Sequence, residues 1–273
     1  MNLESFFSDT DLSGWNSVNW ECTNISRESQ LPWLQLDLPW VLPIEDIARE
    51  AGAVRHLVAP HRSLDQGGYF HTGWNALCLH GLSAQQTESH TCYGYAEDDE
   101  SVPYMWTEIA DRCPVTTEFF KHTFGYLSYK RLRFMWLEPG GAIAPHRDDL
   151  GHRLGPVNIA VTQPSTCDFR MRGYGVIPFQ SGSAFKLDIG QEHAVWNRSS
   201  EPRLHMIIHG VPDWKIWKDI MWRSFRKMRA THAVAPDAPF QERSRETTSA
   251  VADRPSEYTL ETQASAPTSL RTP

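Results

Sequence analysis

From residue 131 onward, short β-rich segments follow one another, separated by Gly, Pro and Asn turns at a spacing of roughly ten residues. Short and evenly spaced strands of this kind are typical of an antiparallel sandwich or an open barrel. The expected strands cover residues 131–139, 157–164, 167–174, 183–189, 193–199 and 203–211. This pattern restricts the second half of the chain to a mainly β architecture.

Helical signals flank the β-rich half. A helix beginning at Pro43 is indicated by the acidic residues that follow it and by apolar residues at helical spacing. A C-terminal segment places Trp217, Ile220 and Phe225 on one helical face, which we interpret as packing against the sheet. The expected elements are a helix at 43–58, a strand at 73–82, one or two short helices broken at Pro114 within 102–124, and a C-terminal helix at 213–229.

The chain therefore divides into three parts. A mainly β domain with flanking helices is expected at 31–231, with its β core at about 70–211. The polar, turn-rich residues 1–30 form an N-terminal lead-in. Residues 232–273 are rich in Ala, Pro, Ser, Thr and Glu, and such a composition predicts a disordered tail.

Composition excludes several classes of protein. The chain has 273 residues, of which 40% are hydrophobic, and its formal net charge of −7 gives it no general attraction to nucleic acid or to an anionic membrane. Its five cysteines show no CxxC spacing, which argues against a disulfide framework and a zinc ribbon. We find no signal-peptide pattern and no apolar run of the ~18 residues that span a membrane. The expected location is cytoplasmic, and the oligomeric state is not indicated.

Polar residues crowd together where the first β-rich run ends, in the sequence "PHRDD" at 145–149. If the strand continues, His146 and Asp148 point to the same face, because side chains alternate along a strand, and Asp149 turns away. Two histidines and one carboxylate form a facial triad that leaves positions open on iron(II) for a chelating cosubstrate and oxygen. His193, which opens a later β-segment, is the expected third ligand.

A cosubstrate such as 2-oxoglutarate also needs a cation for its far carboxylate. Arg203 begins the β-segment after that of His193, ten residues further on, and its guanidinium fork suits a buried carboxylate. By alternation His205 and His209 share the face of Arg203, and we interpret both as core or surface residues.

Together these segments resemble the aspartyl/asparaginyl β-hydroxylase family of iron(II)- and 2-oxoglutarate-dependent dioxygenases. The resemblance covers about residues 70–211 and extends upstream into a helical lead-in similar to that of bacterial and phage members. It is carried by "GWNALCLHG", "RLRFMWLEPGGAIAPHRDD", "GPVNIAVTQPSTCDF" and "QEHAVWNRSSEPRLHMIIHG".

The resemblance implies a double-stranded β-helix, the jelly-roll or cupin-like barrel, that uses Fe(II), 2-oxoglutarate and O2. It implies that His146 and His193 bind the metal and that Arg203 binds 2-oxoglutarate. Asn158 stands where many members have a histidine that also touches the cosubstrate. Animal β-hydroxylases of the family lack a carboxylate beside the first histidine, whereas Asp148 is present here, which favours hydroxylation over halogenation.

The activity implied is hydroxylation of an amino-acid side chain of the Asp or Asn type, free or in a peptide or protein. Alternatives are a dioxygenase acting on a small natural-product intermediate, a non-catalytic cupin-like binding module, and a zinc site in which His152 replaces His193. Tryptophans 74 and 106 are interpreted as core residues rather than as walls of a peptide groove. Six arginines are candidate substrate contacts, although each is more simply interpreted as solvated: Arg131, Arg133, Arg147, Arg153, Arg170 and Arg172.

Overall fold

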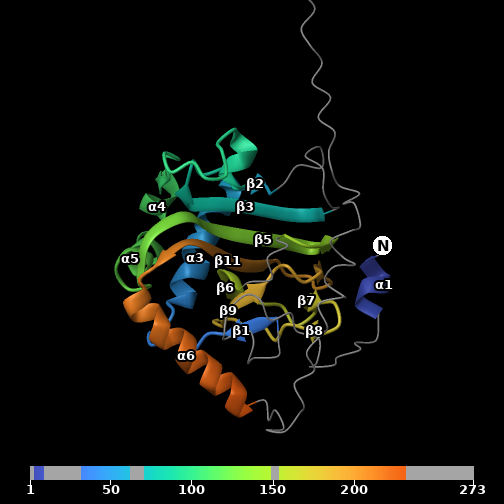
Figure 1. The fold of residues 1–273 in the computed structure, drawn as a ribbon. Coiled ribbons are helices and arrows are strands. Elements are labelled where there is room, and N and C mark those ends of the chain that lie inside the picture. The colour runs from blue at the N-terminus through green and yellow to red at the C-terminus, as the bar shows by residue number, and fades with distance from the viewer. Residues whose placement is uncertain (1–2, 9–31, 62–70, 149–153, 232–273) are drawn as a thin grey trace, which may run out of the picture. The chain divides into compact units, whose positions relative to one another are not determined.

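The computed structural model of the protein describes residues 3–8, 32–61, 71–148 and 154–231 (Figure 1). The predicted disordered tail, most of the predicted lead-in, and Asp149, His152 and Arg153 lie outside the described residues. Strands dominate the described part, and helices flank them.

Antiparallel pairing joins the strands into one continuous sheet, in which β1-β9-β6-β11-β5-β10-β7-β8 are successive neighbours. β3 pairs with β5 and carries β2 and β4. The strands are β1 Trp33–Gln35, β2 Ala59–Pro60, β3 His71–Gly81, β4 Met105–Trp106, β5 Tyr126–His146, β6 Leu154–Thr162, β7 Cys167–Met171, β8 Gly175–Val176, β9 Ala184–Asp188, β10 His193–Asn197 and β11 Arg203–Pro212.

Strand β5 organises this sheet, because its partner changes along its length. Its first part, up to Leu137, pairs with β11, and its last part, from Ala142 to His146, pairs with β10. Its other edge pairs with β3 from Leu132 to Ile143, on both sides of the change of partner, and β3, β5 and β11 lie side by side in Figure 1. β5 therefore belongs both to a larger sheet with β3, β11, β6, β9 and β1 and to a smaller one with β10, β7 and β8. This is the double-stranded β-helix that the resemblance implies.

The change of partner occurs at Gly140 and Gly141. Gly140 has a φ of +72°, a left-handed conformation that glycine adopts without strain. The sequence pattern placed the end of the strand at residue 139 because these glycines were interpreted as a turn. That boundary was wrong, since the strand continues through the bend to His146.

Substitution of Gly141 by alanine is expected to destabilise the fold. The added Cβ would lie 2.8 Å from the carbonyl oxygen of Glu138 and 2.9 Å from that of Thr72, and neither backbone atom can move freely. We expect a loss of about 1–3 kcal/mol in the free energy of unfolding, measured with urea. Gly52→Ala is the control, because nothing lies within 4 Å of the Cβ that it would add. Gly52 also sits in a helix, where alanine in place of glycine raises the free energy of unfolding by about 0.5–1 kcal/mol. Equal effects at the two glycines would contradict the steric argument.

The helices are α1 Leu3–Ser8, α3 Ile44–Val54, α4 Glu108–Arg112, α5 Pro114–His122 and α6 Trp214–Thr231, with short 3-10 turns at Arg55–Leu57 and His90–Tyr93. Glu50 of α3 is buried, and its carboxylate accepts the backbone N–H groups of Val115 and Thr116. These N–H groups lie in the first turn of α5, where a helix favours a negative charge. Pro114 begins α5, so the predicted break there separates two helices.

Helix α6 buries the face that the sequence pattern predicts. Trp217, Ile220 and Phe225 are each at most 5% exposed, and the indole N–H of Trp217 donates to the carbonyl of Phe124. The short strands β2, β4 and β8 were not predicted, because two residues are too few to show a period. None of the helices within the described residues is long and apolar enough to span a membrane.

Candidate active site

His146 and His193 face each other where β5 ends and β10 begins. They are opposite partners in the β5–β10 ladder, and their ring centroids lie 4.3 Å apart. The Nδ1 of His146 is 2.7 Å from the carbonyl oxygen of Ala144, and the Nδ1 of His193 is 2.8 Å from that of Gln191. A carbonyl can only accept, so each Nδ1 carries the proton and donates it. Each ring thus points its Nε2 away from the backbone, and Nε2 is the nitrogen through which a histidine held in this way binds a metal.

Asp148 completes the cluster from just beyond the end of β5. Its backbone N–H donates to the carbonyl of Ile189 at 3.0 Å, which fixes the bend after the strand. One carboxylate oxygen lies 3.5 Å from the Nε2 of His146 and the other lies 3.6 Å from the Nε2 of His193. The strand does not continue to Asp148, as the alternation argument assumed, but the side chain joins the two histidines nonetheless. One atom from each residue lies within 4.8 Å of those from the other two.

The charges of this cluster suit a divalent cation. Burial by itself raises the pKa of Asp148, but the two histidines outweigh it and hold that pKa well below its ordinary value. Burial lowers the pKa of His146, which favours the neutral ring. One carboxylate and two imidazoles form the donor set of a non-heme iron(II) facial triad, so these residues fit the metal that the motifs predict.

Arg203 lies one aromatic ring away from the histidine pair. The ring of Phe169 stacks on His193 with centroids 5.4 Å apart, and the guanidinium of Arg203 lies 5.7 Å from the centre of the same ring. Arg203 is 5% exposed, and burial lowers its pKa to about 10, so that it keeps its positive charge near neutral pH. Its Nε has no hydrogen-bond partner within the described part of the chain, which leaves a buried cation able to accept an anionic partner.

His205 holds Arg203 in place. Arg203 can only donate, so its contact of 2.7 Å with the Nδ1 of His205 makes that nitrogen an acceptor. The Nε2–H of His205 then donates to the Oε1 of Gln163. The Oδ1 of Asn158 lies 2.7 Å from the same Nδ1, and because two acceptors cannot bond, the amide has to turn its NH2 group toward the ring to donate there. Burial and the nearby Arg203 hold the pKa of His205 well below its ordinary value, so the ring stays neutral. Asn158 thus belongs to the Arg203 cluster, and it reaches Arg203 through His205.

The role of His205 was not predicted, although the signal was present in the sequence. Its position two residues after Arg203 predicts a shared face, and the structure confirms both this and its interpretation as a core residue. His209 shares that face as well, but it lies against Arg131.

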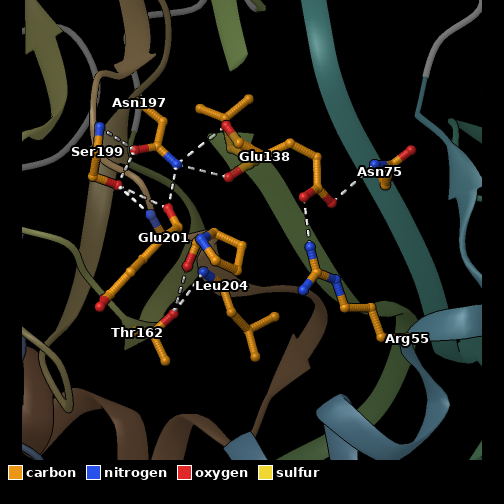
Figure 2. Close-up of polar contacts among 10 residues, drawn as sticks. Arg55, Asn75, Glu138, Thr162, Asn197, Ser199, Glu201 and Leu204 are labelled. Carbon is orange, nitrogen blue, oxygen red and sulfur yellow. Dashed lines mark hydrogen bonds and ion pairs between the residues drawn. The ribbon is translucent and has the colours of Figure 1, made fainter. Parts of the chain in front are cut away.

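Asn197 and Ser199 tie the turn between β10 and β11 to the bend of β5 (Figure 2). Asn197, the last residue of β10, is fully buried, and its side-chain N–H groups donate to the carbonyls of Leu137, Glu138 and Glu201. Its carbonyl oxygen accepts from the backbone and hydroxyl of Ser199. One amide therefore connects the end of β10, the turn that leads into β11 and the bend of β5.

Removal of this amide by Asn197→Ala is expected to cost about 2–4 kcal/mol in the free energy of unfolding, because it leaves buried carbonyls without donors. Urea unfolding followed by circular dichroism measures the loss. Ser199→Ala is the matched control, since it removes a hydroxyl from the same turn and leaves the bonds from Asn197 to β5; about 1 kcal/mol is expected there. A loss at Asn197 no larger than at Ser199 would show that the amide does not anchor the turn.

The candidate substrate contacts divide into several groups. Trp74 and Trp106 pack against the core, as predicted. Arg147 donates to the carbonyl of Gly190, and Arg172 pairs with Glu192. The interpretation of Arg133 as solvated was wrong: it is 4% exposed and donates to the carbonyl of Thr87. A chain segment from residue 82 to 104 covers it, and nothing in the local pattern of β5 could reveal that cover.

Comparison with protein families supplies the context for this geometry. The profile of the family described as Aspartyl/Asparaginyl beta-hydroxylase matches residues 44–212, more than half of the chain. The chain belongs to this family. The prediction made from the motifs is confirmed, and so are the enzyme class, a 2-oxoglutarate-dependent oxygenase, and its cofactors Fe(II) and 2-oxoglutarate. No curated protein matches the chain.

Solved structures of low identity also align with the chain. A prolyl-4-hydroxylase from Pseudomonas putida is 14% identical over 68% of this chain and 96% of its own, with a TM-score of 0.36. An oxidoreductase of the 2OG-Fe(II) oxygenase family from Burkholderia pseudomallei is 12% identical over 72% and 98%, with a TM-score of 0.35. A viral collagen prolyl hydroxylase from Paramecium Bursaria Chlorella virus-1 is 14% identical over 66% and 97%, with a TM-score of 0.33. At these scores the likenesses do not bear on the substrate of this family member.

Proposed function

We propose that residues 31–231 form a hydroxylase domain in which His146, Asp148 and His193 hold Fe(II), and that this domain hydroxylates an amino-acid side chain. The observation that carries the proposal is the convergence of three ligand atoms within 4.8 Å of one another, with Arg203 one ring away. When bound, the metal and 2-oxoglutarate supply the oxidising power that inserts one atom of O2 into a C–H bond.

The residues of the chain have separate tasks in this proposal. The Nδ1–H groups of the two histidines, held by backbone carbonyls, orient their rings toward the metal. Arg203 binds the far carboxylate of 2-oxoglutarate, and His205 and Asn158 keep its guanidinium in place. The rings of Phe169 and Phe179 beside Arg203 exclude water and strengthen the ion pair.

The proposal is tested by succinate release. The purified protein is supplied with Fe(II), 2-oxoglutarate and O2, together with free amino acids or a peptide library. Succinate formation that depends on a substrate, and a product that gains one oxygen atom by mass spectrometry, are the expected results. Protein that makes no succinate and forms no visible absorption band with anaerobic Fe(II) and 2-oxoglutarate would overturn the proposal.

The same screen decides the class of substrate. Stimulation by Asp-containing or Asn-containing peptides, with no response to the free amino acids, supports a protein hydroxylase. Stimulation by free Asp or Asn alone excludes that version. A response to neither leaves the small natural-product intermediates as the remaining class for an active enzyme of this family.

A further inference from the structure

A pocket of about 540 Å³ lies at the far end of β5 and β11 from Arg203. Three of its lining residues come from these strands, namely Lys130, Arg131 and His209. The remaining lining residues come from the segment that leads from β3 to β4, among them His90, Glu97 and Tyr104. None of these residues has a task in the proposed binding of metal or 2-oxoglutarate.

Strand register places this pocket on the same face of the sheet as Arg203. In the ladder between β11 and β5, Arg203 is opposite Leu137, Ile207 is opposite Arg133, and His209 is opposite Arg131. Opposite residues of an antiparallel ladder share a face, as do residues two apart along a strand. Arg133, Arg131 and His209 therefore continue the face that begins with Arg203 and His205.

Within the described part of the chain, no carboxylate forms a hydrogen bond or a close ion pair with these three side chains. Arg131 makes no hydrogen bond or ion pair with the residues that the structure describes. The Nε of Arg133 and the Nδ1 of His209 are buried without hydrogen-bond partners there. Burial lowers the pKa of Arg133 to about 9, so its charge persists near neutral pH, and burial and the arginines keep His209 neutral. Buried polar groups are normally paired, and such a cluster is costly unless a ligand completes it.

The acidic residues near the cluster do not complete it. Glu88 acts electrostatically on both arginines, but its carboxylate lies 3.4 Å from the ring of His61. Glu97 lines the mouth of the pocket and is exposed. The carboxylate of Asp148 acts electrostatically on Arg133 and on His209. The cluster and Asp148 are therefore electrostatically coupled.

We infer that Arg131, Arg133 and His209 form the substrate-anchoring site and that this site takes a carboxylate. The inference rests on the proposed function, in which two carboxylate-bearing molecules bind to separate cations. Arg203 binds the cosubstrate, and the cluster of Arg131, Arg133 and His209 binds the substrate. The planar guanidinium of Arg131 binds the two carboxylate oxygens, and the neutral ring of His209 donates a further hydrogen bond. The carboxylate is that of a free amino acid or that of an acidic side chain within a peptide.

The test is calorimetric titration of the full-length protein, saturated with 2-oxoglutarate and anaerobic Fe(II) so that the Arg203 site is filled. The probes are the free L-amino acids, each paired with its primary amide, and capped aspartate (N-acetyl, C-amide) paired with capped asparagine. We expect at least one carboxylate to bind, with its amide partner at least about 10-fold weaker. Binding of free acids alone assigns the site to a free amino acid, and binding of capped aspartate assigns it to a peptide side chain.

Two variants locate the binding. Arg131→Met is expected to lower the affinity for the carboxylate probe by about 10- to 100-fold. Arg131→Lys should lower it by less, because lysine keeps the charge but loses the two-pronged guanidinium. Lys218→Met removes an exposed cation of α6, outside the pocket, and is the matched control, with a change below about 3-fold expected. The visible band of the Fe(II)–2-oxoglutarate complex is recorded for each variant, and its retention shows that the metal centre has folded.

Several outcomes would overturn the inference. These are the absence of binding by every carboxylate probe, equal binding of acids and amides, unchanged affinity in Arg131→Met, or tighter binding of inorganic phosphate than of any carboxylate. If the wild-type protein forms no visible band, the proposed function fails instead. The same titrations then still report whether the pocket takes a carboxylate.

Discussion

Replacement of His193 by alanine is expected to weaken Fe(II) binding by at least about 100-fold and to abolish the visible band formed with 2-oxoglutarate. The size of the effect follows from its position. Even groups that only orient a ligand cost about 10- to 100-fold in metal affinity when they are removed, and His193 would supply a ligand atom itself. An anaerobic titration of Fe(II) into the protein with 2-oxoglutarate, followed by visible absorbance, measures both quantities. Succinate release should disappear in parallel.

His122→Ala provides the matched control. This histidine ends α5, and its side chain is 70% exposed, so its loss should leave Fe(II) affinity and the band unchanged. Near-ultraviolet circular dichroism shows whether each variant keeps its packed core. Retention of the band in a folded His193→Ala protein would remove His193 from the metal site, as would an equal loss in the control.

Arg203→Met is expected to lower the affinity for 2-oxoglutarate by about 100-fold, while Fe(II) still binds. Methionine fills much of the same space beside Phe169 and Phe179, but it offers no charge to the far carboxylate. The rise in the KM for 2-oxoglutarate should therefore be larger than any fall in kcat at saturating cosubstrate. Titration of 2-oxoglutarate into the anaerobic Fe(II) protein gives the affinity directly.

The nearby Arg198 separates this effect from a general loss of positive charge. It lies five residues before Arg203, pairs with Asp168 and is 46% exposed at its side chain. Arg198→Met should leave the KM for 2-oxoglutarate within about 3-fold of that of the wild-type protein. Unchanged affinity in Arg203→Met would mean that another cation binds the cosubstrate.

Sequence patterns predicted the parts of the site that strand periodicity controls. His146, Asp148, His193 and Arg203 each stand at or just beyond the end of a β-segment, where an alternating pattern stops and a polar residue begins. Because the register of neighbouring strands is fixed by their buried faces, residues at such ends meet in space. Alternation along the strands, together with the donor set that a facial triad requires, predicted that the first three converge, although Asp148 lies just beyond the end of β5.

Other features of the fold and the site depend on contacts between distant parts of the chain, which the residue pattern of a single strand does not show. Arg133 and Arg131 alternate with apolar residues just as solvated strand residues do, and only the cover from residues 82–104 decides that Arg133 is buried. The continuation of β5 through Gly140 and Gly141 was obscured because glycine pairs most often mark turns. Burial and partner choice are tertiary properties, so they override the preferences of a short segment.

The connection between β3 and β4 suggests how enzymes with this architecture can change what they act on. The candidate iron ligands His146 and His193 and the cosubstrate cation Arg203 come from β5, β10 and β11, where a shift of one residue would turn each side chain to the wrong face. The lining of the pocket around Arg131 comes largely from the 82–104 connection, whose ends return to the neighbouring strands β3 and β4. A connection of this kind tolerates insertion and replacement far better than a ladder does. Selectivity can thus evolve, or be redesigned, by exchange of one loop while the oxidative chemistry stays intact.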